Sequence, residues 1–259
     1  MKVYGVIPGR LQSTRLPRKL LLAETGKPLI QYVWESARQA NLLADVLIAT
    51  DSDEIASVVR DFGGRAEMTG DHPSGTDRIA EVARRSLTDA DIIVNIQGDE
   101  PELNPAHIDR VVQLLIDDPQ APMATLATPL HHAEQVLATS CVKVVCGANG
   151  QALYFSRAPI PHLRDRDVAA VLAAGERPWL LHLGIYAYRR DFLLNITRQP
   201  LSRLENQEKL EQLRAIEVGA RIAVGVVDQQ SVGIDTPEDY ARFVNRQLSA
   251  VSHSRRFAA

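Results

Sequence analysis

The chain has 259 residues, of which 45% are hydrophobic and 24% are charged, and its formal net charge is −3. This length and composition are typical of a soluble protein with a sizeable core, and the lack of basic excess argues against a dedicated nucleic-acid binder. No apolar run approaches the ~20 residues of a membrane span, and the first residues lack a secretory signal. We therefore expect a cytoplasmic protein without membrane or nucleic-acid partners.

The first half of the chain alternates between strand and helix signals. Strands are predicted at Val3–Ile7, Val46–Thr50, Arg65–Met68 and Ile92–Ile96, and helices at Leu29–Ala40, Ile55–Phe62 and Gly75–Ser86. Pro28 suits the start of the first helix, and Gly63-Gly64 ends the second. This alternation predicts a mostly parallel sheet with helices on both faces.

The second half has a different pattern. Strands are predicted at Met123–Pro129, Cys141–Val145, Ala152–Ser156, Leu181–Tyr188 and Ile222–Val227, with one helix at Leu204–Val218. The turn residues 147–150 indicate a hairpin, and residues 158–179 indicate a long irregular connection. Thr236-Pro237-Glu238-Asp239 is a strong start signal for a final helix.

No internal repeat and no long linker divides the chain. We predict one α/β domain over residues 1–259, with a Rossmann-like, mixed, mostly parallel sheet and an inserted subregion at about 130–180 for dimerisation or sugar binding. Cys141 and Cys146 are the only cysteines. Their spacing places them on opposite faces of a strand, which predicts free thiols.

Cations gather in the loop that follows the first strand. The loop contains Arg10, Ser13, Thr14, Arg15, Arg18 and Lys19. A polyphosphate is held by such Arg and Lys heads together with hydroxyls and backbone N–H groups. The loop has neither the Walker spacing GxxxxGK[ST] nor the dinucleotide-binding GxGxxG. We expect it to hold phosphate groups, with a plain basic surface loop as the alternative.

A second polar cluster, His72-Pro73-Ser74-Gly75-Thr76-Asp77-Arg78, stands at the start of a predicted helix. Ser74 and Gly75 open this helix, whose free N-terminal amides can bind an anion or a base carbonyl. Arg78 follows one turn later. The alternative is an ordinary capped helix with a solvated arginine.

Acidic residues follow two of the predicted strands. Gln97-Gly98-Asp99 comes directly after an apolar strand, and Asp235 lies between the last strand and the last helix. Ligands of open α/β sheets sit beyond the carboxyl ends of the strands, where two carboxylates can hold Mg²⁺ against phosphate oxygens. The alternatives are a simple Gly-Asp turn and a simple acid before a helix.

A further group in the second half would suit a polyhydroxylated, negatively charged ligand. Its members are Arg157, His182, Tyr186, Tyr188, Glu211 and Gln212. His182, Tyr186 and Tyr188 share one strand face because they stand at even spacings. For each residue alone, packing or a solvated position is the simpler interpretation.

Several of these segments together resemble one protein family. The segments IPGRLQSTRLPRK, HPSGTDR, NIQGDEP, LYFSRAPIP, HLGIYAYRRDFL, LEQLRAIEVGARI and VGIDTPEDY follow one another between residues 7 and 240. They closely resemble the 3-deoxy-manno-octulosonate (Kdo) cytidylyltransferases, also called CMP-Kdo synthetases. The resemblance extends over most of the chain, and HPSGTDR with NIQGDEP is its most specific part.

The resemblance implies a GT-A-type nucleotidyltransferase fold, a homodimer and dependence on Mg²⁺. It implies the reaction of CTP with Kdo to give CMP-Kdo and diphosphate, for lipopolysaccharide biosynthesis. In the implied mechanism the anomeric hydroxyl attacks the α-phosphorus in line, with metal assistance. Three alternatives stay open: a cytidylyltransferase for another acid sugar, such as 8-amino-Kdo or sialic acid, a GT-A glycosyltransferase, and a non-catalytic nucleotide-binding or regulatory module.

The resemblance also implies residue roles. Asp99, Asp235, Lys19 and Arg10 would be catalytic, with Asp99 and Asp235 as the Mg²⁺ ligands. CTP would be bound by Arg10, Ser13, Lys19, Ser74 and Gly75. The acid sugar would be surrounded by Arg15, Arg78, Gln97, Arg157, His182, Tyr186, Glu211 and Gln212.

The first loop departs from the family at three positions. Gly9, Arg18 and Leu20 stand where the family usually has Ala, Gly and Pro. We expect Gly9 to be harmless. The additional charge of Arg18 beside Lys19 is expected to alter loop mobility or triphosphate affinity.

Overall fold

The structure is a computed structural model that describes the backbone of residues 1–257 and the side chains of residues 1–250. Its strands are β1 (Val3–Gly9), β2 (Asp45–Thr50), β3 (Arg65–Met68), β4 (Ile92–Asn95), β5 (Met123–Pro129), β6 (Lys143–Cys146), β7 (Ala152–Ser156), β8 (Leu180–Arg189) and β9 (Ile222–Val226). Its helices are η1 (Lys19–Leu21), α1 (Leu29–Ala37), α2 (Asp53–Asp61), α3 (Gly75–Arg85), α4 (Pro105–Asp117), α5 (Ala133–Leu137), α6 (Val168–Ala173), α7 (Arg190–Ile196), α8 (Arg203–Glu208), α9 (Gln212–Glu217) and α10 (Pro237–Phe257).

The strands of the described chain form one mixed sheet. Its main path runs β3-β2-β1-β4-β8-β5-β9, and β6 pairs with both β7 and β8. The first four strands of this path are parallel, β8 is antiparallel to both of its neighbours β4 and β5, and β9 is parallel to β5. The predicted α/β fold with a mixed sheet is thereby confirmed.

Alternate residues of the central strands point to opposite faces of the sheet, and each face has its own core. Ile7 and Ile48 belong to a cluster that includes residues of α1, α2 and α4. Val6 and Leu47 belong to a second cluster with residues of α3, α7 and α9. The helices therefore cover both faces, as the strand–helix alternation predicts.

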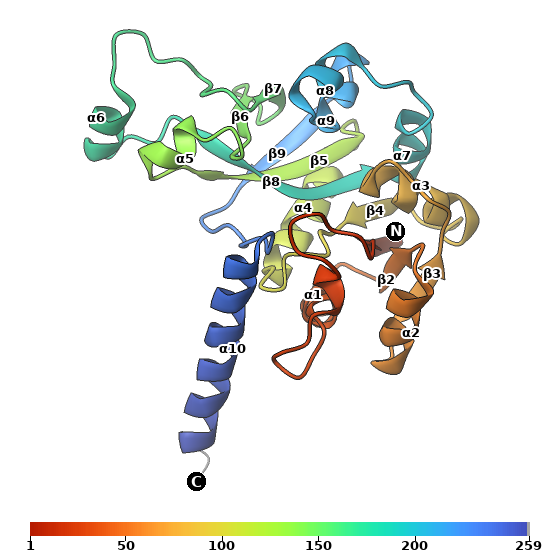
Figure 1. Cartoon of the computed structure of the whole chain (residues 1–259). Helices are drawn as coiled ribbons and strands as arrows, with labels where there is room; N and C mark the ends of the chain where they lie inside the picture. Colours follow the sequence, from red (N-terminus) through yellow and green to blue (C-terminus); the bar gives the residue numbers. More distant parts are fainter. Residues whose placement is uncertain (258–259) are drawn as a thin grey trace.

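The start of α10 packs against the elements that carry the first loop. Tyr240, Phe243 and Val244 form a small core with Leu16 and Leu29. Thr236 caps the helix, because its hydroxyl accepts a hydrogen bond from Asp239 N at 3.2 Å, so the predicted start signal is confirmed. The rest of α10 projects away from the sheet (Figure 1).

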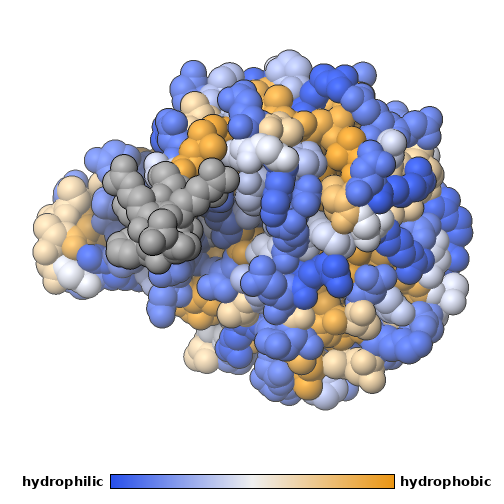
Figure 2. Space-filling view, turned by 90° about the horizontal axis from the view of Figure 1, so that it is seen from below, coloured by the Kyte–Doolittle hydropathy of each residue, from blue (hydrophilic) through white to orange (hydrophobic). Residues whose placement is uncertain are grey.

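Figure 2 shows the molecule of Figure 1 from below. On this face hydrophobic residues form small groups that are separated by hydrophilic residues. None of the helices formed by the described residues is long and apolar enough to span a membrane.

The structure corrects the prediction of a single helix at Leu204–Val218. The helix is broken between α8 and α9, where Lys209 has a left-handed φ of 53°. The guanidinium of Arg157 donates hydrogen bonds to the carbonyls of Glu208 and Lys209 at 2.7 and 3.3 Å. Carbonyls at the end of α8 are thus paired without a continuing helix.

Other segments also differ from the sequence expectations, which include no helix at the positions of α5 and α7. Helix α6 interrupts the connection expected to be irregular at 158–179. Helix α4 was not anticipated, although its start signal is ordinary: Pro105 is at the first position, and the Asn104 side chain accepts from Ala106 N at 3.0 Å. Such a cap and proline are recognisable in the sequence.

Candidate active site

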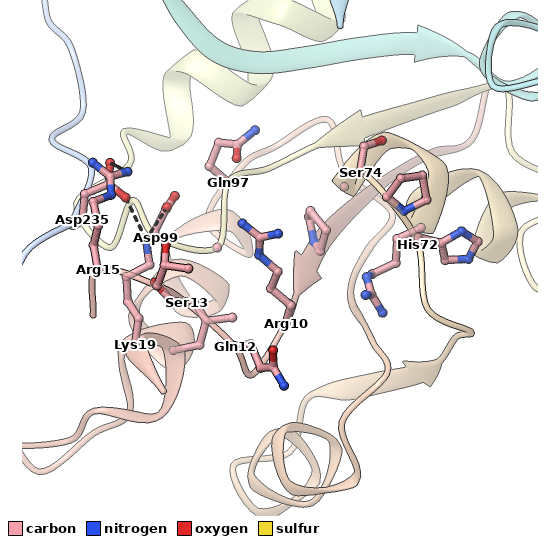
Figure 3. Close-up of a pocket in the computed structure, with 18 of the residues that line it drawn as sticks. Arg10, Gln12, Ser13, Arg15, Lys19, His72, Ser74, Gln97, Asp99 and Asp235 are labelled. Atoms are coloured by element: carbon pink, nitrogen blue, oxygen red, sulfur yellow. Dashed lines mark hydrogen bonds and ion pairs between the residues drawn. The ribbon is translucent and has the colours of Figure 1, made fainter. Parts of the chain in front are cut away.

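A cavity of about 430 Å³ lies beyond the carboxyl ends of β1 and β4. It is lined by the first loop, the start of α3, the segment after β4, and the loop before α10 (Figure 3). These four stretches are far apart in sequence, and together with Glu211 at the start of α9 they converge at the edge of the sheet where α/β folds bind ligands.

The centre of the charged part of this cavity is the ammonium group of Lys19. Lys19 Nζ lies 2.7 Å from Asp99 Oδ2 and 3.1 Å from Asp235 Oδ1. Arg15 reaches the other oxygen of Asp235 at 2.9 Å. Asp99 and Asp235 are thus brought together around one positive charge, although 135 positions separate them in the numbering.

Hydrogen bonds hold the loop of Asp235 against the segment of Asp99. Ile234 N donates to the Asp99 carbonyl at 2.9 Å, and the hydroxyl of Ser231 donates to the carboxyl of Glu100. Burial raises the pKa of Glu100 to about 7, with the Asp99 charge adding to the effect. These contacts hold the segments that carry Asp99 and Asp235 in a fixed relative position.

The donor set fits a hard divalent cation that is shared with a ligand. Two carboxylates already converge on a cation, the Lys19 ammonium. Among the residues with described side chains, no group of three or more His, Cys, Asp or Glu could hold a metal. Mg²⁺ usually takes one or two carboxylates and completes its shell with water and substrate phosphates, so a pair of acids suffices here.

Arg10 and Ser13, for which CTP binding stays a prediction, both line the cavity. Arg10 extends into the space between Gln97 and His72 (Figure 3). In the part of the chain with described side chains Arg10 forms no ion pair, and it is exposed. Its guanidinium is therefore free to receive an anion.

The start of α3 contributes a helix N-terminus to the cavity. The Ser74 hydroxyl accepts from Asp77 N at 3.1 Å and donates to Asp77 Oδ2 at 2.8 Å. Because this hydroxyl already caps the helix, contact with a ligand would come mainly from backbone N–H groups. A Cβ added at Gly75 would lie only 3.2 Å from Pro8 Cγ, so glycine lets the helix approach β1 closely.

Arg18 is turned away from the cavity. Its backbone is left-handed, with φ 57° and ψ 25°, and its side chain pairs with Glu54 at the start of α2. The charge of Arg18 is thus directed to α2 rather than toward a phosphate. An effect of Arg18 on loop mobility or triphosphate affinity stays a prediction.

Arg78 lines the cavity but is 4% exposed. It donates to Asp51 Oδ2 at 2.6 Å and to Thr69 Oγ1 at 2.5 Å. These bonds connect α3 to the segments that follow β2 and β3. At least two N–H groups of the Arg78 guanidinium are engaged in these bonds. A role of Arg78 in binding the sugar stays a prediction.

Gln97 and Glu211, both predicted around the sugar, line the same cavity as Asp99. Gln97 Nε2 donates to the Gly184 carbonyl at 2.8 Å. Burial raises the pKa of Glu211. Gln212 lines a smaller neighbouring hollow together with Tyr188 and Glu211.

Arg157, His182 and Tyr186 are not in the lining of this cavity as formed by the described side chains. Besides the end of α8, the Arg157 guanidinium bonds the Thr139 carbonyl at 3.0 Å. His182 and Tyr186 stand side by side on β8, with ring centroids 5.3 Å apart. Their roles toward the sugar stay predictions.

Besides Thr14 of the first loop, the cavity includes Gln12 and His72, which were not assigned a role from sequence. His72 Nε2 lies 2.6 Å from Glu81 Oε2, and this bond lowers the pKa of Glu81. The sequence signal that indicates a role for Gln12 and His72 is their position, since both lie in or next to segments singled out for ligand binding.

Comparison with known proteins identifies relatives along most of the chain. The family model described as Cytidylyltransferase matches residues 4–222. The 3-deoxy-manno-octulosonate cytidylyltransferase of Geobacter sulfurreducens is 46% identical over 250 residues, which cover 95% of this chain and 99% of that protein. The protein of the same name from Rhodopirellula baltica is 47% identical over 247 residues, covering 95% and 98%.

Solved structures agree with these relatives. A structure of CMP:2-keto-3-deoxy-manno-octonic acid synthetase complexed with CTP matches with a TM-score of 0.88 and 42% identity, covering 96% of this chain and 100% of that one. A cytidylyltransferase from Leptospira borgpetersenii, 15% identical with a TM-score of 0.61, shares the fold. The chain therefore belongs to the cytidylyltransferase family, among the 3-deoxy-manno-octulosonate cytidylyltransferases.

Proposed function

We propose that this chain transfers the cytidylyl group of CTP to the anomeric hydroxyl of Kdo, giving CMP-Kdo and diphosphate for lipopolysaccharide biosynthesis. Family membership gives the reaction class, nucleotidyl transfer. The single observation that carries the catalytic assignment is the convergence of Asp99 and Asp235 on one ammonium group inside the cavity. A cytoplasmic location stays a prediction from the sequence.

The residues of the chain act by binding and orienting the reactants. Arg10 and Lys19 would hold the triphosphate, with Ser13 and the N–H groups at the start of α3 around the nucleotide. In-line displacement at phosphorus depends on positioning and charge stabilisation rather than on a protein nucleophile. Asp99 and Asp235 would hold Mg²⁺, whose chemistry when bound is charge neutralisation and a lowered pKa of the attacking hydroxyl.

The acid sugar would lie between the nucleotide and β8. Arg15 and Gln97 line the main cavity, and Glu211 lines both this cavity and the smaller one beside it. Arg78, Arg157, His182, Tyr186 and Gln212 complete the proposed surroundings. The carboxylate of the sugar would be matched by arginine.

Diphosphate release tests the function directly. The protein is assayed with each of the four nucleoside triphosphates and with Kdo, 8-amino-Kdo and sialic acid. We expect release only with CTP, and fastest with Kdo. Efficient release with another triphosphate, or with 8-amino-Kdo or sialic acid in preference to Kdo, would contradict the proposal.

Asp99→Asn tests the metal assignment. Loss of one carboxylate charge should lower kcat on the order of 10²-fold or more, because charge stabilisation in the transition state is lost. Binding of Mn²⁺ to the complex with a non-hydrolysable CTP analogue should weaken in parallel. Asp61→Asn, at the exposed end of α2, is the matched control. Near-normal turnover of folded Asp99→Asn would rule out this role.

We also propose a homodimer formed through the subregion of α5, α6 and the β6–β7 hairpin. Helices α5 and α6 extend to one side of the sheet (Figure 1), and the subregion exposes Leu137 and Leu153 at 58% and 60%. Light scattering after size-exclusion chromatography measures the mass. A monomer mass at micromolar concentration would contradict the dimer.

A further inference from the structure

Strand β8 contains an irregularity next to the proposed sugar site. Thr125 of β5 pairs with Tyr186, whereas the next residue, Leu126, pairs with Leu183. Gly184 and Ile185 are therefore additional residues on β8, which makes this a β-bulge. Bulges are common next to active sites, where they redirect side chains. Gln97, from the main cavity, bonds the Gly184 carbonyl at 2.8 Å.

The hydroxyl of Thr125 lies at the centre of this bulge. Thr125 is fully buried. Its Oγ1 is 2.8 Å from the Ile185 carbonyl, 3.1 Å from the Leu183 carbonyl and 3.1 Å from His182 Nε2. Two of these partners are carbonyl oxygens, which can only accept hydrogen bonds.

The direction of the single hydroxyl proton of Thr125 determines which of the three partners accepts a hydrogen bond and which donates one. If it pointed to His182, two oxygen atoms would face each other at 2.8 Å with no proton between them, and a buried carbonyl would lose its donor. If it points to Ile185, the Thr125 oxygen keeps a free lone pair. His182 is then the one partner of the three that can supply a proton to it.

The proton of a neutral histidine then lies on Nε2, and Nδ1 carries a lone pair. Burial lowers the pKa of His182 to about 3, so the ring is neutral near pH 7. The ring lies between Phe155 and Tyr186, at centroid distances of 5.1 and 5.3 Å. These neighbours restrict rotation of the ring away from Thr125.

We propose that Thr125 is a positioning residue: it holds His182 with the proton on Nε2, so that Nδ1 accepts a hydrogen bond from a hydroxyl of the acid sugar. The second half of this statement rests on the proposed function. The first half concerns the free protein alone. Thr125 acts through His182 and touches no substrate itself.

Nuclear magnetic resonance of the free protein tests the first half. The full chain is labelled with ¹⁵N at histidine, and the His182 signals are assigned by their loss in His182→Gln. At pH 7 we expect a neutral ring with its proton on Nε2, in slow exchange with water. A protonated ring, or a proton on Nδ1, would overturn the proposal without any change to Thr125.

Two variants of Thr125 separate positioning from packing. Thr125→Ser keeps the hydroxyl and should keep the Nε2 proton and a KM for Kdo close to that of the wild type. Thr125→Val keeps the shape but removes the hydroxyl. It should give a mixed tautomer signal and raise the KM for Kdo roughly two- to tenfold, as expected for one lost hydrogen bond. The KM for CTP should not change in either variant.

The outcomes are distinguishable. A single Nε2-protonated signal in folded Thr125→Val would overturn the positioning role, and an unchanged KM for Kdo beside an altered tautomer would overturn the acceptor role. If Thr125→Val does not fold, the wild-type spectrum and Thr125→Ser decide. Absence of turnover with any acid sugar, beside the expected spectrum, would contradict the proposed function and leave the assignment of the proton intact.

Discussion

Single charged residues determine how the first loop is held. Lys19, 9% exposed, is fixed between two carboxylates, and Arg15 binds one of them from outside. Arg18, one position before Lys19, is paired with Glu54 instead. Neighbouring cations of one loop thus have different tasks, because the left-handed backbone at Arg18 turns its side chain toward α2.

Arg18→Gly tests this division. Loss of the exposed ion pair should destabilise the fold by about 0–1 kcal/mol. Glycine avoids the strain of a left-handed residue, which stabilises the fold by about 1–2 kcal/mol. Glycine also adds conformational entropy to the unfolded chain, which acts in the opposite direction. We expect urea unfolding to show a change within about 1 kcal/mol. The KM for CTP should rise about two- to fivefold, because the loop loses its tether to α2.

Glu54→Gln is the matched control, since it removes the pair and keeps the backbone of Arg18. It should raise the KM for CTP to a similar extent. A normal KM for CTP in both variants would show that the pair does not restrain the loop.

At the scale of elements, α8 and α9 are joined by a buried ion pair. Arg214 Nε and Nη2 lie 2.7 and 2.5 Å from the two carboxylate oxygens of Glu205, and both side chains are largely buried. This pair holds α9, and therefore Glu211 at its start, beside the cavity. Bidentate geometry of this kind offsets part of the cost of burying charge.

Removing one partner of the Arg214–Glu205 ion pair should strongly destabilise the fold. Glu205→Ala leaves the Arg214 charge buried and unpaired, and we expect the free energy of unfolding to fall by about 3–5 kcal/mol. The exposed pair of Arg166 and Glu176 is the comparison: Glu176→Ala should lower the free energy of unfolding far less than Glu205→Ala does. Equal losses of unfolding free energy in the two variants, measured by chemical denaturation, would show that burial does not distinguish the two ion pairs.

At the scale of the whole molecule, burial of titratable groups makes stability depend on pH. His182 has its pKa lowered from 6.5 to about 3 by burial. Below pH 6.5 the unfolded chain binds a proton there and the folded protein does not. This group therefore lowers the free energy of unfolding as the pH falls from 6.5 toward 3.

His182→Gln should make the pH profile flatter. Between pH 7 and pH 5 the wild type should lose on the order of 1–2 kcal/mol more than the variant in urea unfolding. The raised pKa of Glu211 acts in the opposite direction, but it is common to both proteins and cancels in the comparison. Parallel profiles for the two proteins would contradict a neutral, buried His182.

Residue patterns alone predict the fold class and the location of the site. Strand–helix alternation and apolar strands fix a sheet covered on both faces, because each pattern has a period that suits only one element. The cations of the first loop and the acids Asp99 and Asp235 follow strand ends, so their convergence at one edge was predictable. The roles of Ser74 and Gly75 at a helix start were predictable from capping preferences.

The pairing of polar groups, in contrast, depends on the packed chain. Arg157 binds carbonyls at the end of α8, Arg78 binds Asp51, and Arg18 binds Glu54, and nothing local to these arginines specifies such partners. The break between α8 and α9 and the bulge at Gly184 involve donors that are distant in sequence: Arg157, which follows β7, and Thr125 of β5. Hydrogen-bond partners and burial are properties of the packed chain, and local residue patterns do not contain them.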